Sequence, residues 1–171
     1  MKTMTKNNRN HITILGIGNT LYTDEGLGVH ALSSLEEIYR TDDQVNIVDG
    51  STDGMSLLGP VEDTDYLIVI DAINAGKEGG TIIELRGDDI PAYYGIKMSI
   101  HQLGFQEVLL ASKLRERYPK HIVMFGMQPT SLELGIGLSE TNEAKLPELV
   151  KVVEQQVTAW KNEMALSLIH I

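Results

Sequence analysis

The stretch ITILGIGNTLYTDEGLGVHA, residues 12–31, decides how the fold of this chain is interpreted. It begins as an apolar run, breaks at Gly16 and Gly18, passes through a polar turn and then becomes periodic again. This order predicts a strand, a loop and a helix. In open α/β proteins the first such loop lies at the carboxyl edge of the sheet, where ligands bind. The loop carries Asp24 and Glu25, whose negative charge suits a cation and repels a phosphate.

The composition indicates one ordinary globular domain. The 171 residues are 42% hydrophobic and 22% charged, and a chain of this length buries roughly 70% of the surface that it exposes when unfolded. It contains no cysteine, which excludes disulfides, thiolate nucleophiles and zinc–thiolate sites. Any metal must therefore be held by carboxylate or imidazole groups.

The charge and the amino-terminal residues argue against several classes of partner. The chain has 14 Lys and Arg residues against 24 Asp and Glu residues, a net charge of -10, whereas nucleic-acid binding normally requires a basic face. Residues 1–10 are polar, and no window reaches the roughly 18 apolar residues of a membrane span. We therefore expect a cytoplasmic monomer that binds neither nucleic acid nor membranes.

Strands and helices alternate along the rest of the chain. Apolar runs typical of strands occupy residues 12–17, 45–49, 66–71, 81–86 and 121–127. The helical patterns cover 26–40, 55–58, a segment from its N-cap at 99 to 117, and 142–161, with loops over 87–100 and 128–139. This alternation predicts a three-layer α/β/α sandwich around a mostly parallel, twisted sheet of about five strands.

The tail LSLIHI, residues 166–171, does not continue the preceding pattern. Its coding sequence would resemble a transposase mosaic end of the kind used in sequencing libraries, so we interpret it as a non-native tail. On this interpretation residues 1–165 form a single domain.

Three residues form a candidate metal site. Asp71 ends a predicted strand and Glu25 follows another, so a parallel sheet would bring both to one edge, together with Asp49. His101 lies in the first turn of a predicted helix, where the helix dipole favours the neutral imidazole that binds metals. Two carboxylates and one imidazole suit nickel, zinc or manganese. Each side chain also has a structural interpretation, as a helix-start acid, a strand-end cap or a first-turn polar residue.

A dinucleotide-binding fold is the alternative interpretation of the first loop. Gly16 and Gly18 follow a strand, and Asp49 ends the next one. The fingerprint requires a third glycine where this chain has Leu21, and it places a phosphate beside the acidic pair at 24 and 25. The sequence therefore favours the metal site.

Four motifs link these residues to a known family. They are GIGNTLYTDEGLGVHAL at 16–32, VDGSTDGMSLL at 48–58, YLIVIDAI at 66–73 and SIHQLGFQEVL at 99–109, in order and within residues 12–138. Together they resemble the successive motifs of the hydrogenase maturation endopeptidases. These enzymes remove a C-terminal peptide from the large subunit of nickel-iron hydrogenases after nickel insertion.

The resemblance implies a role for each site residue. The metal-contacting acids of the family fall on Glu25 and Asp71, its histidine on His101, and its further acid on Asp49. The implied enzyme is an aspartyl-type endopeptidase that docks the three metal-contacting residues onto nickel already held by the precursor. Asp49 is then our candidate for the general base or for the acid that orients water. Alternatively, the metal itself activates the water.

The chain departs from the family pattern at two places. Ser51 replaces a glycine of a DGGT-like turn beside Asp49, and Ile100 stands where some members have proline. A non-catalytic nickel-sensing assembly factor is the alternative function, and it would need the three metal-contacting residues but not Asp49. We interpret Asp24 as a structural cap.

Overall fold

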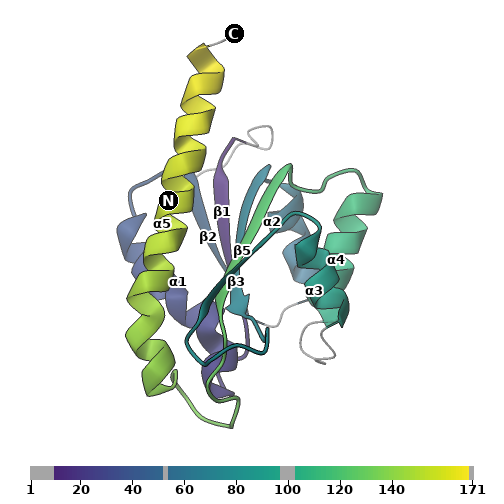
Figure 1. The fold of residues 1–171 in the computed structure, drawn as a ribbon. Helices are drawn as coiled ribbons and strands as arrows, with labels where there is room; N and C mark the ends of the chain where they lie inside the picture. The colour runs from purple at the N-terminus through teal and green to yellow at the C-terminus, as the bar shows by residue number, and fades with distance from the viewer. Residues whose placement is uncertain (1–9, 52–53, 97–102, 170–171) are drawn as a thin grey trace.

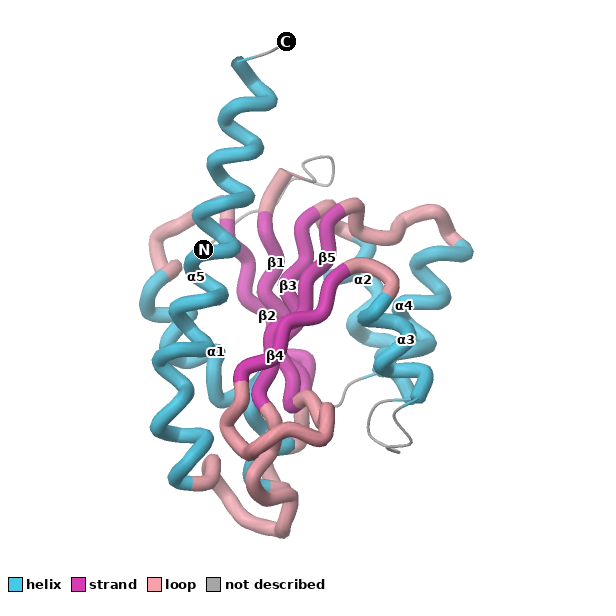
Figure 2. The backbone as a smooth tube through the Cα atoms, in the orientation of Figure 1, coloured by secondary structure: helices cyan, strands magenta, loops and turns pink. Residues whose placement is uncertain are grey.

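A five-stranded sheet forms the centre of the computed structural model, which describes residues 10–51, 54–96 and 103–169 (Figures 1 and 2). The strand order is β2-β1-β3-β5-β4, with β4 antiparallel to β5 and the other pairs parallel. The strands are β1 (Ile12–Ile17), β2 (Val45–Ser51), β3 (Tyr66–Ala72), β4 (Ile82–Arg86) and β5 (His121–Met127).

Helices cover both faces of the sheet, which confirms the predicted α/β/α sandwich (Figure 1). Helices α1 and α5 pack on one face, and α2, α3 and α4 pack on the other. The described part of the chain contains no helix with the length and apolar character that crossing a bilayer requires. The helices are η1 (Thr23–Gly26), α1 (Leu27–Ile38), η2 (Gly54–Leu57), α2 (Leu58–Glu62), α3 (Asp89–Ile96), α4 (Leu103–Leu114) and α5 (Glu140–Ile169).

The central strands are apolar on both sides because each side faces a separate hydrophobic core. In β3, Ile68 and Ile70 pack into the core beneath α1 and α5, whereas Leu67 and Val69 pack into the core beneath α3 and α4. All four side chains are fully buried. The continuous apolar run of this strand is therefore the pattern of a parallel strand covered on both faces.

Helix α1 lies close to the sheet because its second residue is a glycine. A Cβ atom at Gly28 would lie 2.1 Å from the carbonyl oxygen of Ile70 and 2.3 Å from that of Ile17. A side chain at this position would push the helix away from β1 and β3. The contact places the turn that carries Glu25 directly over the end of β3.

The predicted loop over 87–100 is wrong, since α3 occupies residues 89–96. Ile90 and Tyr94, four residues apart on one helix face, are buried against the sheet. Pro91 lies in the first turn of the helix, where the missing N–H costs nothing. The first residues of the helix predicted from 99, up to 102, lie outside the described residues.

Helix α5 is longer than predicted at both ends. It begins at Glu140, where Ser139 accepts a hydrogen bond from the backbone N–H of Asn142 at 3.3 Å and so acts as the N-cap. The helix continues through residues 166–169, the described part of the predicted non-native tail. The origin of that tail stays a prediction.

Asp24 is structural, but it does not cap the helix that follows it. Its carboxylate is fully buried and accepts hydrogen bonds at 2.9 Å from the backbone N–H groups of Thr130, Ser131 and Ser139. The Ser139 hydroxyl adds a fourth hydrogen bond at 2.8 Å. Asp24 therefore ties the loop after β1 to the loop after β5 and to the positive end of α5.

We expect Asp24→Asn to lower the free energy of unfolding by about 3 kcal/mol, because an amide presents a donor to groups that need an acceptor. Urea denaturation measures the change. Asp43→Asn, in an exposed turn, is the matched control and should change stability by less than about 0.5 kcal/mol. Equal stability of the two variants would contradict the anchoring role of Asp24.

Candidate active site at the carboxyl edge of the sheet

The three acids predicted to meet at one edge of the sheet do so. Strands β1, β2 and β3 are parallel, so Asp49 near the end of β2 and Asp71 near the end of β3 reach the same edge. Gly16 lies between them, paired with Asp49 on one side and with Ile70 on the other. Two strand spacings separate the two acidic strands, about 10 Å. Glu25 lies in η1, above the same edge.

Asp71 is fully buried and its carboxylate orientation is set by two donors. One oxygen accepts the backbone N–H of Ala72 at 2.8 Å, and the other accepts the hydroxyl of Tyr94 at 2.9 Å. Burial, together with the negative charges of Asp71 and Glu25, raises the pKa of Tyr94 well above its usual value. Tyr94 thus stays protonated as a donor, and Glu25 is close enough to act on it electrostatically.

Tyr93, the neighbour of Tyr94 in α3, holds the backbone at the end of β3. Its hydroxyl donates to the carbonyl of Ala72 and accepts the N–H of Asn74, both at 3.2 Å. These two tyrosines are the residues that the sequence analysis missed. The signal was present in the spacing of Ile90 and Tyr94, which matches one face of a helix.

Asp49 differs from Asp71 because it is exposed. One oxygen of its carboxylate, Oδ1, accepts the backbone N–H of Ser51 at 3.0 Å and the Ser51 hydroxyl at 2.7 Å. Ser51 has a φ of 41°, a left-handed conformation that glycine adopts without strain. The serine in place of the family glycine therefore keeps this backbone turn and adds a second donor to Asp49.

His101 lies outside the described residues, so its position relative to Glu25 and Asp71 stays a prediction. Within the ranges that the structure describes, no three metal-binding side chains form a cluster. The segments that flank the predicted site do meet: a Cβ atom at Gly104 would lie 2.6 Å from the Cα of Gly54. The motif of Asp49 and the motif of His101 are thus in contact through their glycines.

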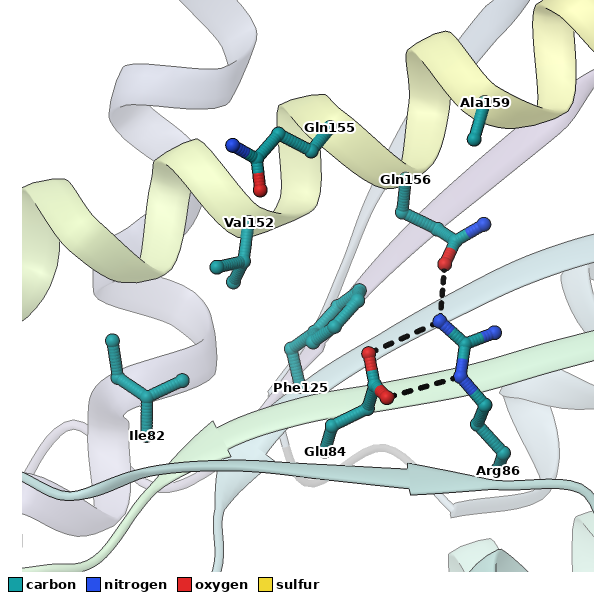
Figure 3. Close-up of a pocket in the computed structure, with 8 residues that line it drawn as sticks. All are labelled: Ile82, Glu84, Arg86, Phe125, Val152, Gln155, Gln156 and Ala159. Atoms are coloured by element: carbon teal, nitrogen blue, oxygen red, sulfur yellow. Dashed lines mark hydrogen bonds and ion pairs between the residues drawn. The ribbon is translucent and has the colours of Figure 1, made fainter.

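A cavity of about 290 Å³ between β4 and α5 (Figure 3) is a separate feature of the structure. Two charged side chains line it: Arg86 donates two hydrogen bonds to Glu84, at 3.1 and 3.0 Å, and one to Gln156 at 2.6 Å. None of Glu25, Asp49 and Asp71 lines it. The cavity is therefore not part of the candidate active site.

Comparison with known families shows to which class of protein this chain belongs. The profile of the family described as hydrogenase maturation protease, HycI, matches residues 29–156. The chain belongs to the hydrogenase maturation protease family. The match includes Asp49 and Asp71 and covers most of the chain.

Individual hydrogenase maturation proteases are similar over nearly the whole chain. The hydrogenase 2 maturation protease of Escherichia coli K12 is 44% identical over 144 residues, which are 83% of this chain and 88% of the relative. The solved hydrogenase maturating endopeptidase HybD of E. coli has a TM-score of 0.81 at 40% identity, covering 90% of this chain and 93% of that one. The NiFe hydrogenase maturation protease HybD of Thermococcus kodakarensis has a TM-score of 0.71 at 25% identity, covering 86% and 99%.

This hydrogenase maturation protease is therefore a hydrolase of the endopeptidase type. Membership of a protease family argues against the dinucleotide-binding alternative and against the non-catalytic assembly factor. The exposed Asp49 and the buried Asp71 give the protease two carboxylates in different environments at one edge, which is the usual basis for different chemical roles.

We expect Tyr94→Phe to lower proteolytic activity roughly tenfold, because outer partners of this kind orient the groups that bind or react. The loss of one buried hydrogen bond should lower the free energy of unfolding by about 1 kcal/mol. Tyr93→Phe is the control, since it removes hydrogen bonds to the backbone and leaves the Tyr94 hydroxyl on Asp71. Steady-state cleavage measures the effect, and equal activity of Tyr94→Phe and wild type would remove Tyr94 from the site.

Proposed function

We propose that this endopeptidase acts in the cytoplasm and removes the C-terminal peptide from the large-subunit precursor of a nickel-iron hydrogenase. The nickel already held by the precursor serves as the recognition feature and belongs to the substrate. The main support is one arrangement in a protease family member: Glu25, a tyrosine-oriented Asp71 and an exposed Asp49 lie at a single sheet edge. In this proposal Glu25, Asp71 and His101 contact the nickel.

The carboxylate of Asp71 has the chemistry of a ligand for a divalent ion. The carboxylate of Asp71 accepts hydrogen bonds from Ala72 and Tyr94, and carboxylate oxygens are among the ligands that divalent ions take in proteins. The Tyr94 hydroxyl corresponds to the outer hydrogen bond that orients a metal-binding carboxylate. Because Asp71 is buried, neighbouring side chains must rearrange when the precursor's nickel reaches it.

Asp49 is suited to proton transfer because its carboxylate is both accessible and oriented. The two Ser51 hydrogen bonds end on Oδ1, so Oδ2 can take a proton from water. The water oxygen would add to the carbonyl carbon of the scissile bond, and Asp49 would pass the proton to the amide nitrogen as the C–N bond breaks. The ends of β2 and β3 lie about 10 Å apart on either side of β1, so an extended peptide that crosses the sheet edge would pass both acids.

Incubation with the purified precursor tests the proposed function. Mass spectrometry of the nickel-loaded precursor should show loss of the C-terminal peptide, whereas the nickel-free precursor should remain intact, because the three contacts that align the peptide bond are missing. Zinc-loaded precursor controls for any divalent ion. Equal cleavage of the loaded and nickel-free forms would refute nickel recognition, and no cleavage of any form would refute the proposed substrate.

We expect Asp49→Asn to bind the precursor normally and to cleave it at least a hundredfold more slowly, because the amide cannot accept the proton. His101→Ala should instead weaken binding of the nickel-loaded precursor and abolish its processing. Asp43→Asn, exposed at the other end of β2, should cleave at the wild-type rate. Single-turnover cleavage and a separate binding assay distinguish these effects, and undiminished cleavage by Asp49→Asn would exclude it as the base.

A further inference from the structure

We propose that an exposed apolar rim beside the candidate active site is the docking surface for an apolar polypeptide segment of the precursor. This inference rests on the proposed function and adds the part of the enzyme that holds the substrate protein. The rim contains two of the most exposed large apolar side chains described, with 78% of Leu134 and 90% of Ile136 accessible. Its members are Leu21, Tyr22, Leu132, Leu134 and Ile136.

The rim is built by pairing of two segments that are far apart in the sequence. Tyr22 forms a parallel bridge with Gly135. The N–H of Gly135 donates to the carbonyl of Leu21 at 2.8 Å, and the N–H of Thr23 donates to the carbonyl of Gly135 at 3.0 Å. In a further hydrogen bond, the N–H of Asp24 donates to the carbonyl of Ser131 at 3.1 Å. The two segments therefore present their apolar side chains as one ordered surface.

The buried carboxylate of Asp24 fixes this surface in place. Its hydrogen bonds hold Thr130 and Ser131 at one end of the second segment and Ser139 beyond the other end. Between these anchors the loop keeps Leu132, Leu134 and Ile136 exposed. A Leu or Ile side chain left in water forgoes the stabilisation that its burial would give, and ordered apolar patches of this kind mark interaction surfaces.

The position of the rim identifies its occupant. Leu21 and Tyr22 precede Glu25 within the same turn, and Asp24, which anchors the rim, is the immediate neighbour of Glu25. A substrate peptide must cross the edge that carries Glu25, Asp49 and Asp71, so the surface that contacts it continues directly onto the rim. The precursor polypeptide beside the scissile bond is therefore the partner that reaches both the sheet edge and the rim. Apolar side chains in that polypeptide would match the rim.

Two rim variants and one matched control test the inference. Leu134→Ser and Ile136→Ser should each raise KM for the nickel-loaded precursor at least fivefold and together at least tenfold, with kcat changed less than twofold. Leu114→Ser is the control because Leu114 is 77% exposed. It is the last residue of α4, in the connection that leads to the start of β5, away from the carboxyl edge. This control should leave KM unchanged, and thermal unfolding should show that the single, double and control variants all fold.

A binding measurement keeps the rim and the proposed function separate. The dissociation constant of the intact nickel-loaded precursor should rise at least tenfold for the double rim variant and stay constant for Leu114→Ser. Wild-type KM and affinity in the double variant would overturn the docking surface while leaving the proposed function in place. Binding without cleavage by the wild type would refute the proposed function, and the affinities would still show whether the rim binds the precursor. A wild-type dimer that the rim variants convert to monomer would assign the rim to self-association and overturn the inference.

Discussion

The buried carboxylate of Asp24 is the interaction on which the functional edge depends. It connects the first loop of the chain to the last, across 115 residues of sequence to Ser139. Each of its four hydrogen bonds comes from the loop after β5 or from the start of α5. The same turn carries Glu25, so the position of a candidate metal-contacting residue and the shape of the opposite loop are determined together. Both would be lost if the anchor loosened.

Most of the fold follows from patterns that are local in the sequence. The strand predicted at 121–127 is confirmed with the same ends, and the continuous apolar run of β3 correctly indicates a strand covered on both faces. Helix α3 was missed because its stability comes from burial of Ile90 and Tyr94 against the sheet. Its sequence contains proline, glycine and two tyrosines, which have low helix propensity outside such a context. Tertiary packing thus stabilises α3, which local sequence patterns do not predict.

The site was predictable in its placement and not in its environment. Parallel strands bring their ends to one edge, so Asp49 and Asp71 could be placed together from the sequence. Which of them is buried depends on contacts between distant segments, such as the hydroxyl of Tyr94 on Asp71. Asp24 was interpreted as a structural cap, and no local pattern indicates that its partners lie more than 100 residues away. The contribution of His101 remains a prediction, since it lies outside the described residues.

The reversed direction of β4 determines where the tyrosines of α3 are delivered. Because β4 is antiparallel to β5, it starts beside Met127 at the carboxyl edge and ends beside Val123, further toward the opposite edge. Helix α3 follows β4 and therefore runs back toward the carboxyl edge, where Tyr94 meets Asp71. A parallel strand in this place would start its following helix at the carboxyl edge and direct it away. The antiparallel direction of β4 thus places α3, a connecting helix, where its tyrosines support the candidate active site.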